Sequence, residues 1–315
     1  MQRIPLLEGA RRLLSILVEG YTTLNRRLWV LAIPIGLDLY LWLGPRVSLR
    51  GLFESLATLS QQFAQTGAPA ALPLTDPPDL VGLISSPLLS VLIPRLDNPA
   101  RPGYAALDWV PPSPLLLLLA GLAAAALVVL FWSLYLLPLA DLVRGTNESG
   151  LGMLRRVPGT WGRMLLYCGM LLAGGAIVLF GIGAITVLAE VLSAGLTVLV
   201  LSVAGALVIW GLLFLFMAPY AILLSGVGPL QAIYYSFRAA RTRLWSTMGF
   251  FLLTTMVQAG TASLWGRLAG QPVLVLLGII ANGYVVGGLA AAGLLFFREN
   301  LRDWLGRQGK AKVVQ

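Results

Sequence analysis

Polar side chains inside apolar segments are the residues with which this sequence could do chemistry. Asp38 lies ten residues into an apolar stretch that begins near residue 28, about 15 Å along a helix that rises 1.5 Å per residue. A charged carboxylate near the middle of a bilayer costs about 2.5–3.5 kcal/mol, so Asp38 must face the protein interior, bind a partner or be protonated. Proton or ion handling is the functional interpretation. Because no basic residue lies at a matching depth, we favour a structural, hydrogen-bonded role.

Further polar side chains occur near the C-terminus. Thr254, Gln258 and Thr261 recur at i, i+4 and i+7, so they form one stripe on a helix, and Asn282 lies near the middle of the next apolar segment. Together with Asp38 they predict a buried polar cluster. Such interhelical contacts average about 0.6 kcal/mol, which is enough to select a helix register but does not define a substrate site.

The missing residue types exclude most familiar catalytic chemistry. The sequence has no His and one Cys, Cys168, so it cannot form a Ser-His-Asp or Cys-His pair, a histidine metal site or an intrachain disulfide. We therefore predict no catalytic residues, no metal and no cofactor. The net charge of +9 belongs to basic residues dispersed along the chain, which favours attraction to anionic lipid over nucleic-acid binding.

The elements that must position these side chains are membrane spans. Of 315 residues, 58% are hydrophobic and 11% are charged, against roughly 25% charged in a soluble domain. The predicted fold is an all-α, polytopic membrane bundle, because the apolar runs have the length needed to cross a bilayer. Six spans are expected, near residues 28–44, 114–141, 164–189, 194–222, 247–268 and 272–297.

Basic residues set the expected orientation. If the N-terminus lies in the cytoplasm, 17 of the 22 Lys and Arg residues are cytoplasmic, and only Arg46, Arg50, Arg95, Arg101 and Arg267 lie outside. This positive-inside bias predicts a multi-pass protein of the cytoplasmic membrane with both termini in the cytoplasm.

The predicted units follow from these spans. Segment 1–27 is an amphipathic helix that lies on the membrane surface or packs on the base of the protein. The first hairpin, 28–144, contains an external loop, 46–113, with ten prolines between Pro69 and Pro112 and an eleventh, Pro114, directly after it. Within this loop, 51–65 could form a helix and 82–96 could rest on the outer interface. The loop either caps the bundle or binds a protein partner. A second unit at 145–224, a third at 225–297 and a basic cytoplasmic tail at 298–315 complete the chain.

A short pattern recurs before the first, third and fifth spans, where Trp29, Trp161 and Trp245 each lie within two residues of an arginine. Tryptophan and arginine both anchor the end of a span at the headgroups. We interpret the pattern as three tandem units, each a cytoplasmic surface helix followed by a transmembrane hairpin. The associated arginines are candidate contacts for anionic lipid or an acidic partner: Arg155, Arg156, Arg163, Arg238, Arg241 and Arg243.

The stretch 226–253 contains a Gly228-Pro229-Leu230 turn, then Ala232, a Ser236-Phe237-Arg238 segment and Trp245. It resembles the signature region of a group of bacterial six-helix membrane proteins that includes the membrane domain of some glycerophosphodiester phosphodiesterases. The resemblance implies a membrane bundle concerned with lipid or envelope processes. It carries over no catalytic residue, because the phosphodiesterase chemistry belongs to a separate soluble domain.

Three functions remain, in descending order. The first is a non-enzymatic scaffold, accessory subunit or lipid-associated factor of a bacterial cytoplasmic membrane. The second is a transporter or permease with a polar site around Asp38, although repeats in parallel orientation differ from the inverted repeats of many transporters. An intramembrane enzyme comes last.

The orientation is testable by cysteine labelling after Cys168 has been replaced. A thiol at position 75 or 90 should react from outside intact cells, and one at position 150 or 312 only after permeabilisation, because the basic segments remain inside. External labelling at 312 would contradict the prediction of six spans with both termini in the cytoplasm.

Overall fold

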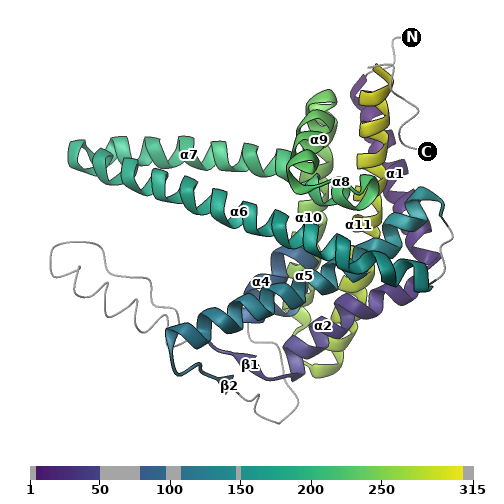
Figure 1. Ribbon diagram of the computed structural model, residues 1–315, viewed down its shortest axis with the longest axis horizontal. Coiled ribbons are helices and arrows are strands. Elements are labelled where there is room, and N and C mark those ends of the chain that lie inside the picture. The colour runs from purple at the N-terminus through teal and green to yellow at the C-terminus, as the bar shows by residue number, and fades with distance from the viewer. Residues whose placement is uncertain (1–4, 50–78, 97–107, 147–149, 308–315) are drawn as a thin grey trace. The chain divides into compact units, whose positions relative to one another are not determined.

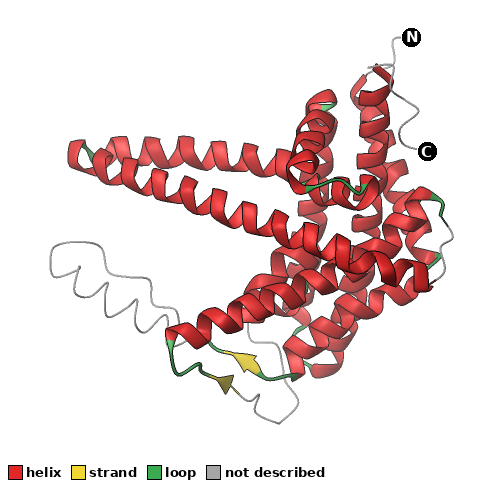
Figure 2. Cartoon of the chain, viewed as in Figure 1, coloured by secondary structure: helices red, strands yellow, loops and turns green. Residues whose placement is uncertain are grey.

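A computed structural model describes residues 5–49, 79–96, 108–146 and 150–307. This part of the chain is almost entirely helical, with one pair of two-residue strands (Figure 2). In chain order the elements are α1 Pro5–Asn25, η1 Leu28–Leu31, α2 Ala32–Leu43, β1 Arg46–Val47, α4 Leu80–Leu89, η2 Ile93–Arg95, β2 Asp108–Trp109, α5 Pro114–Arg144, α6 Gly150–Leu192, α7 Ala194–Leu215, α8 Ala218–Ser225, α9 Pro229–Thr242, α10 Leu244–Leu268 and α11 Pro272–Arg307.

The chain divides into two compact units, and the long helices α5, α10 and α11 each contribute to both. Unit 1 contains residues 1–27, 136–255 and 288–315, and unit 2 contains residues 28–135 and 256–287. Each unit is described separately below.

Four helical segments among the described residues are long and apolar enough to cross a membrane: Pro114–Arg144, Leu151–Leu192, Ala194–Ser225 and Pro272–Gly306. They correspond to four of the six expected spans. The expected span at 28–44 is a shorter apolar helix, Leu28–Leu43. It starts as a 3-10 turn because Pro34, in the first turn of α2, has no amide hydrogen to donate. The expected span at 247–268 is the 25-residue α10, which is not among the four.

The second tandem unit differs from the prediction in one respect. A surface helix and a separate span were expected around Trp161, but α6 runs without a break for 43 residues and contains Pro158. Proline removes one backbone hydrogen bond and can be accommodated within a long helix, so the two expected elements are one.

Helices α6 and α7 form a long antiparallel hairpin in unit 1 (Figure 1). The turn between them is closed by Ser193, whose hydroxyl accepts a hydrogen bond from the Leu196 amide. In the most apolar 18-residue stretch of Leu151–Leu192 no residue is buried inside the protein. In the corresponding stretch of Ala194–Ser225 only 6% of the residues are buried. A Cβ added at Gly174 or Gly181 of α6 would meet nothing within 4 Å, so these glycines are not sites of close helix packing.

Close helix packing in unit 1 occurs instead between α1 and α11. A Cβ added at Gly20 would lie 2.7 Å from the backbone nitrogen of Ala292, and one at Gly288 would overlap the ring of Tyr21. Nearby, Phe250 of α10 stacks on Phe296 of α11 with ring centroids 4.6 Å apart. The N-terminal helix is therefore packed on the protein itself, which was one of the two expected arrangements.

Unit 2 contains the described parts of the expected external loop. In it α4 packs on α2, and β1 pairs with β2 in parallel. The segment 82–96 was expected to rest on the outer interface, but Leu89, Val91 and Leu92 are buried within the unit. Burial of these apolar side chains keeps the segment inside the protein. The helix expected at 51–65 lies outside the described residues.

The α1–α11 contact makes a stability prediction. Gly20→Ala should lower the free energy of unfolding by about 1–3 kcal/mol, because the new methyl group overlaps backbone atoms of α11. Gly169→Ala, in α6, is the control, since a Cβ there meets nothing within 4 Å. Thermal unfolding in detergent should show a lower melting temperature for the first variant only. Equal melting temperatures would contradict the packing.

Candidate functional site

The carboxylate of Asp38 is the centre of a polar cluster in unit 2. Asp38 lies on α2 with a relative exposure of 1%. Its Oδ1 accepts hydrogen bonds from the backbone amides of Leu92 and Ile93 at 2.8 and 2.9 Å, and its Oδ2 accepts one from Leu92 at 2.9 Å. Hydrogen bonds from backbone N–H groups stabilise a carboxylate that is removed from water. Asp38 therefore fixes the turn between α4 and η2.

Local sequence positions that turn. Asp79 caps the N-terminus of α4 by accepting a hydrogen bond from the Gly82 amide at 2.9 Å. At the other end Ser90 adopts the left-handed conformation, with φ of 50°, and its amide donates to the Ser86 carbonyl. A left-handed residue is a common helix stop. The chain after Ser90 is thereby directed so that the next amides reach Asp38.

Two further predicted residues meet the same turn. The amide nitrogen of Asn282, on α11, donates to the Ser90 carbonyl at 3.1 Å. The Ser90 hydroxyl lies 3.4 Å from Oε1 of Gln258, on α10. Three of the five residues of the predicted cluster, Asp38, Gln258 and Asn282, are thus brought together on one non-helical segment.

The other two predicted members lie elsewhere. Thr261 donates to the carbonyls of Val257 and Gln258 in its own helix. Thr254 belongs to unit 1, where its hydroxyl donates to the Phe251 carbonyl. Both hydroxyls serve their own helix.

No basic residue was expected at the depth of Asp38, but in the structure Arg95 lies close enough to interact with it electrostatically. Its guanidinium donates to the Ser86 carbonyl at 3.3 Å. Burial lowers the pKa of Arg95, and the nearby charge of Asp38 acts in the opposite direction. Arg95 belongs to the expected external loop, and a sequence-based prediction cannot assign a depth in the membrane to a residue of a loop.

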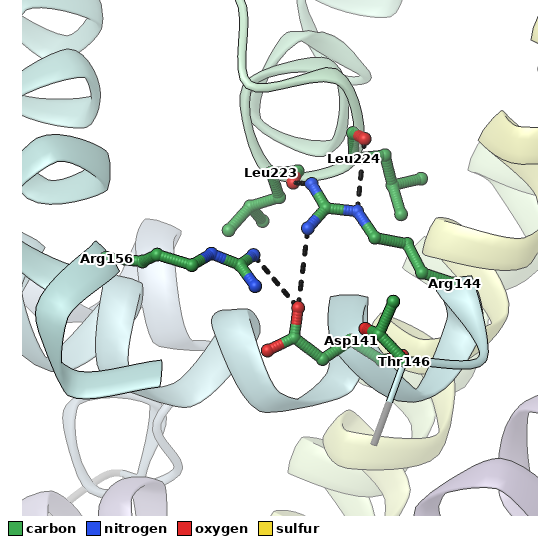
Figure 3. Close-up of polar contacts among 6 residues, drawn as sticks. All are labelled: Asp141, Arg144, Thr146, Arg156, Leu223 and Leu224. Atoms are coloured by element: carbon green, nitrogen blue, oxygen red, sulfur yellow. Dashed lines mark hydrogen bonds and ion pairs between the residues drawn. The ribbon is translucent and has the colours of Figure 1, made fainter. Parts of the chain in front are cut away.

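A second buried carboxylate, Asp141, lies in unit 1 near the end of α5 (Figure 3). Its Oδ1 is 2.9 Å from the Arg156 guanidinium and 3.4 Å from that of Arg144. Arg144 also donates to the carbonyls of Leu223 and Leu224, at the end of α8. Removing one partner of a buried ion pair leaves the other charge uncompensated, which is strongly destabilising. Because its members belong to α5 and α6 and bond to α8, the cluster holds these three helices together. The spacing of Asp141 and Arg144, three residues apart on one helix, is the feature of the sequence from which part of this cluster could have been predicted.

A third charged group links α1 and α11 with Arg243, which lies between α9 and α10. The Arg12 side chain donates to Glu299 at 3.0 Å, and Arg243 pairs with Asp303 at 2.7 Å. Arg298 of α11 donates to the Val143 carbonyl. These side chains are partly exposed, so each pair contributes modestly.

The predicted lipid-contacting arginines therefore fall into two sets. Arg156 and Arg243 are engaged in intrachain ion pairs, whereas Arg155, Arg163 and Arg241 are exposed and Arg238 is half-exposed. Of the expected interface anchors, Trp29 and Trp245 are 54% and 81% exposed, and Trp161 is half-buried.

Among the described residues no group of three or more His, Cys, Asp or Glu side chains could hold a metal ion. No family model, curated protein or solved structure matches the chain. The resemblance of the stretch 226–253 to six-helix membrane proteins stays a prediction.

The bonds to the α4–η2 turn predict the effect of changing Asp38. Asp38→Leu should lower the melting temperature in detergent, because each buried amide left without an acceptor costs about 1–3 kcal/mol. Asp38→Asn should retain assembly, since its carbonyl oxygen still accepts. Thr261→Val is the control, because that hydroxyl bonds only to its own helix. A Leu variant as stable as the parent would rule out the structural role.

Proposed function

We propose that this chain is a non-enzymatic integral membrane protein of a bacterial cytoplasmic membrane, acting as a scaffold, accessory subunit or lipid-associated factor. The observation that carries the proposal is how the buried acids are used. Asp38 accepts backbone amides and Asp141 pairs with two arginines. Carboxylates engaged in this way support helix packing and leave little capacity for proton transfer.

The proposal includes six spans with both termini in the cytoplasm. Helix α10 and the apolar helix Leu28–Leu43 would be the two spans additional to the four long apolar helices. Sixteen helical residues are roughly 24 Å long, less than a hydrocarbon core of about 30 Å. Local thinning of the bilayer accommodates such a mismatch at modest cost.

Anionic lipid is the proposed partner of the exposed arginines. Each Arg near an anionic surface contributes about 1 kcal/mol, and the attraction weakens with salt. A protein partner through the external loop 46–113 remains part of the proposal, and most of that loop lies outside the described residues.

Transport is a second candidate because Asp38, Gln258 and Asn282 converge from three helices on a non-helical segment. Non-helical backbone at a polar site is a feature of transporter substrate sites. If a well-folded Asp38→Asn protein lost a pH-dependent flux in proteoliposomes, transport would replace the scaffold.

The two sets of arginines provide the test for lipid association. The double variant Arg155→Gln and Arg163→Gln should retain less phosphatidylglycerol after purification, with an unchanged melting temperature, because both side chains are exposed. Arg156→Gln is the matched control, one residue away. It should lower the melting temperature by removing a partner of buried Asp141 and leave lipid retention unchanged. Unchanged retention in the folded double variant would refute lipid contact by these arginines.

A further inference from the structure

Helix α9 has one face that is already covered within unit 1. Ala232, Ser236 and Ala239 are fully buried, and the helix packs on α7 and α8. The Ser236 hydroxyl donates to the Phe214 carbonyl of α7. These contacts fix the rotation of α9 about its own axis, so the side that it presents outward is determined.

The outward side carries an apolar stripe. Leu230, Tyr234 and Phe237 recur at i, i+4 and i+7, and are 71%, 46% and 40% exposed. The two rings also have contacts with other helices of unit 1, Phe237 with Phe214 of α7 and Tyr234 with Trp304 of α11. They lie opposite the buried small residues on the helical wheel. A helix whose inner face is already covered has no need of a second apolar face in water, because exposing such side chains to water is unfavourable.

Positive charge accompanies this stripe. Arg241 continues it one turn further, and the Arg238 guanidinium lies 5.1 Å from the centroid of the Tyr234 ring. The helix Pro229–Thr242 contains no acidic residue. Trp245, which is 81% exposed, follows directly at the start of α10. Exposed leucine and aromatic rings beside arginines are typical of helices in the interfacial layer of an anionic membrane.

We propose that α9 lies in the plane of the membrane, with Leu230, Tyr234 and Phe237 inserted below the headgroups of an anionic leaflet and with Arg238 and Arg241 against lipid phosphates. This inference rests on the proposed membrane function and deepens it by naming the surface that meets the lipid. Interfacial helices of this kind are buried by about 5–10 Å. The rings supply apolar contact, and Tyr234 orients the Arg238 guanidinium.

Spin labels on the full-length protein test the proposal. In a Cys168→Ala background, labels would be attached through Leu230→Cys or Phe237→Cys, with Gln231→Cys as the control on the shoulder of the same helix. The protein would be reconstituted in vesicles of phosphatidylcholine with or without phosphatidylglycerol. Oxygen, which concentrates in lipid, and a water-soluble nickel chelate would be compared as relaxing agents.

The ratio of oxygen to nickel accessibility should be several-fold higher at 230 and 237 than at 231, and it should fall when phosphatidylglycerol is omitted. Greater nickel accessibility at 230 and 237 than at 231 would overturn the proposal. So would exclusion of both agents, which indicates a protein contact. A ratio that is insensitive to phosphatidylglycerol would overturn the anionic contact. Because the lipid-retention test uses arginines of α6, its failure and the failure of this proposal are distinguishable.

Discussion

Every charge and every backbone polar group that this chain removes from water must find a partner inside the protein, since an apolar surrounding supplies none. The two aspartates that are fully buried in the described part of the chain meet this requirement differently. Asp38 takes neutral donors, the amides of Leu92 and Ile93, whereas Asp141 takes two guanidinium groups. In unit 2 the hydrogen bonds of Asp38 fix the turn between two short helices. In unit 1 the ion pairs of Asp141 hold together the ends of longer helices, which we propose to be cytoplasmic.

The same requirement governs helix ends, where the last carbonyls of a helix have no partner in that helix. Arg144 donates to the carbonyls of Leu223 and Leu224, and Arg298 donates to that of Val143. In each case the donor belongs to a different helix from the acceptor. Capping therefore also sets which helix ends are neighbours within unit 1. The arginines that cap these ends are ones that the positive-inside rule would use only to predict membrane orientation.

The parts of the structure that depend on local composition could be predicted from the sequence. Long apolar runs gave the four membrane-length helices, and the cost of polar groups at depth predicted that Asp38, Gln258 and Asn282 would gather. The backbone segment on which they converge could not be predicted, because the groups that donate to Asp38 are backbone amides, which nearly every residue has. The pairing of Arg156 was missed for another reason: its partner, Asp141, lies on another helix. The break expected between a surface helix and a span near Trp161 does not occur, because the one hydrogen bond lost at Pro158 is small against the rest of a 43-residue helix.

The continuity of α6 has a mechanical consequence. A helix of 43 residues is about 65 Å long, roughly twice the thickness of a hydrocarbon core. Such a helix behaves as a stiff rod, and its end near Arg156 is clamped by a buried ion pair. Proline leaves one backbone hydrogen bond unmade, so Pro158, two residues beyond the clamp, is where this rod bends most easily.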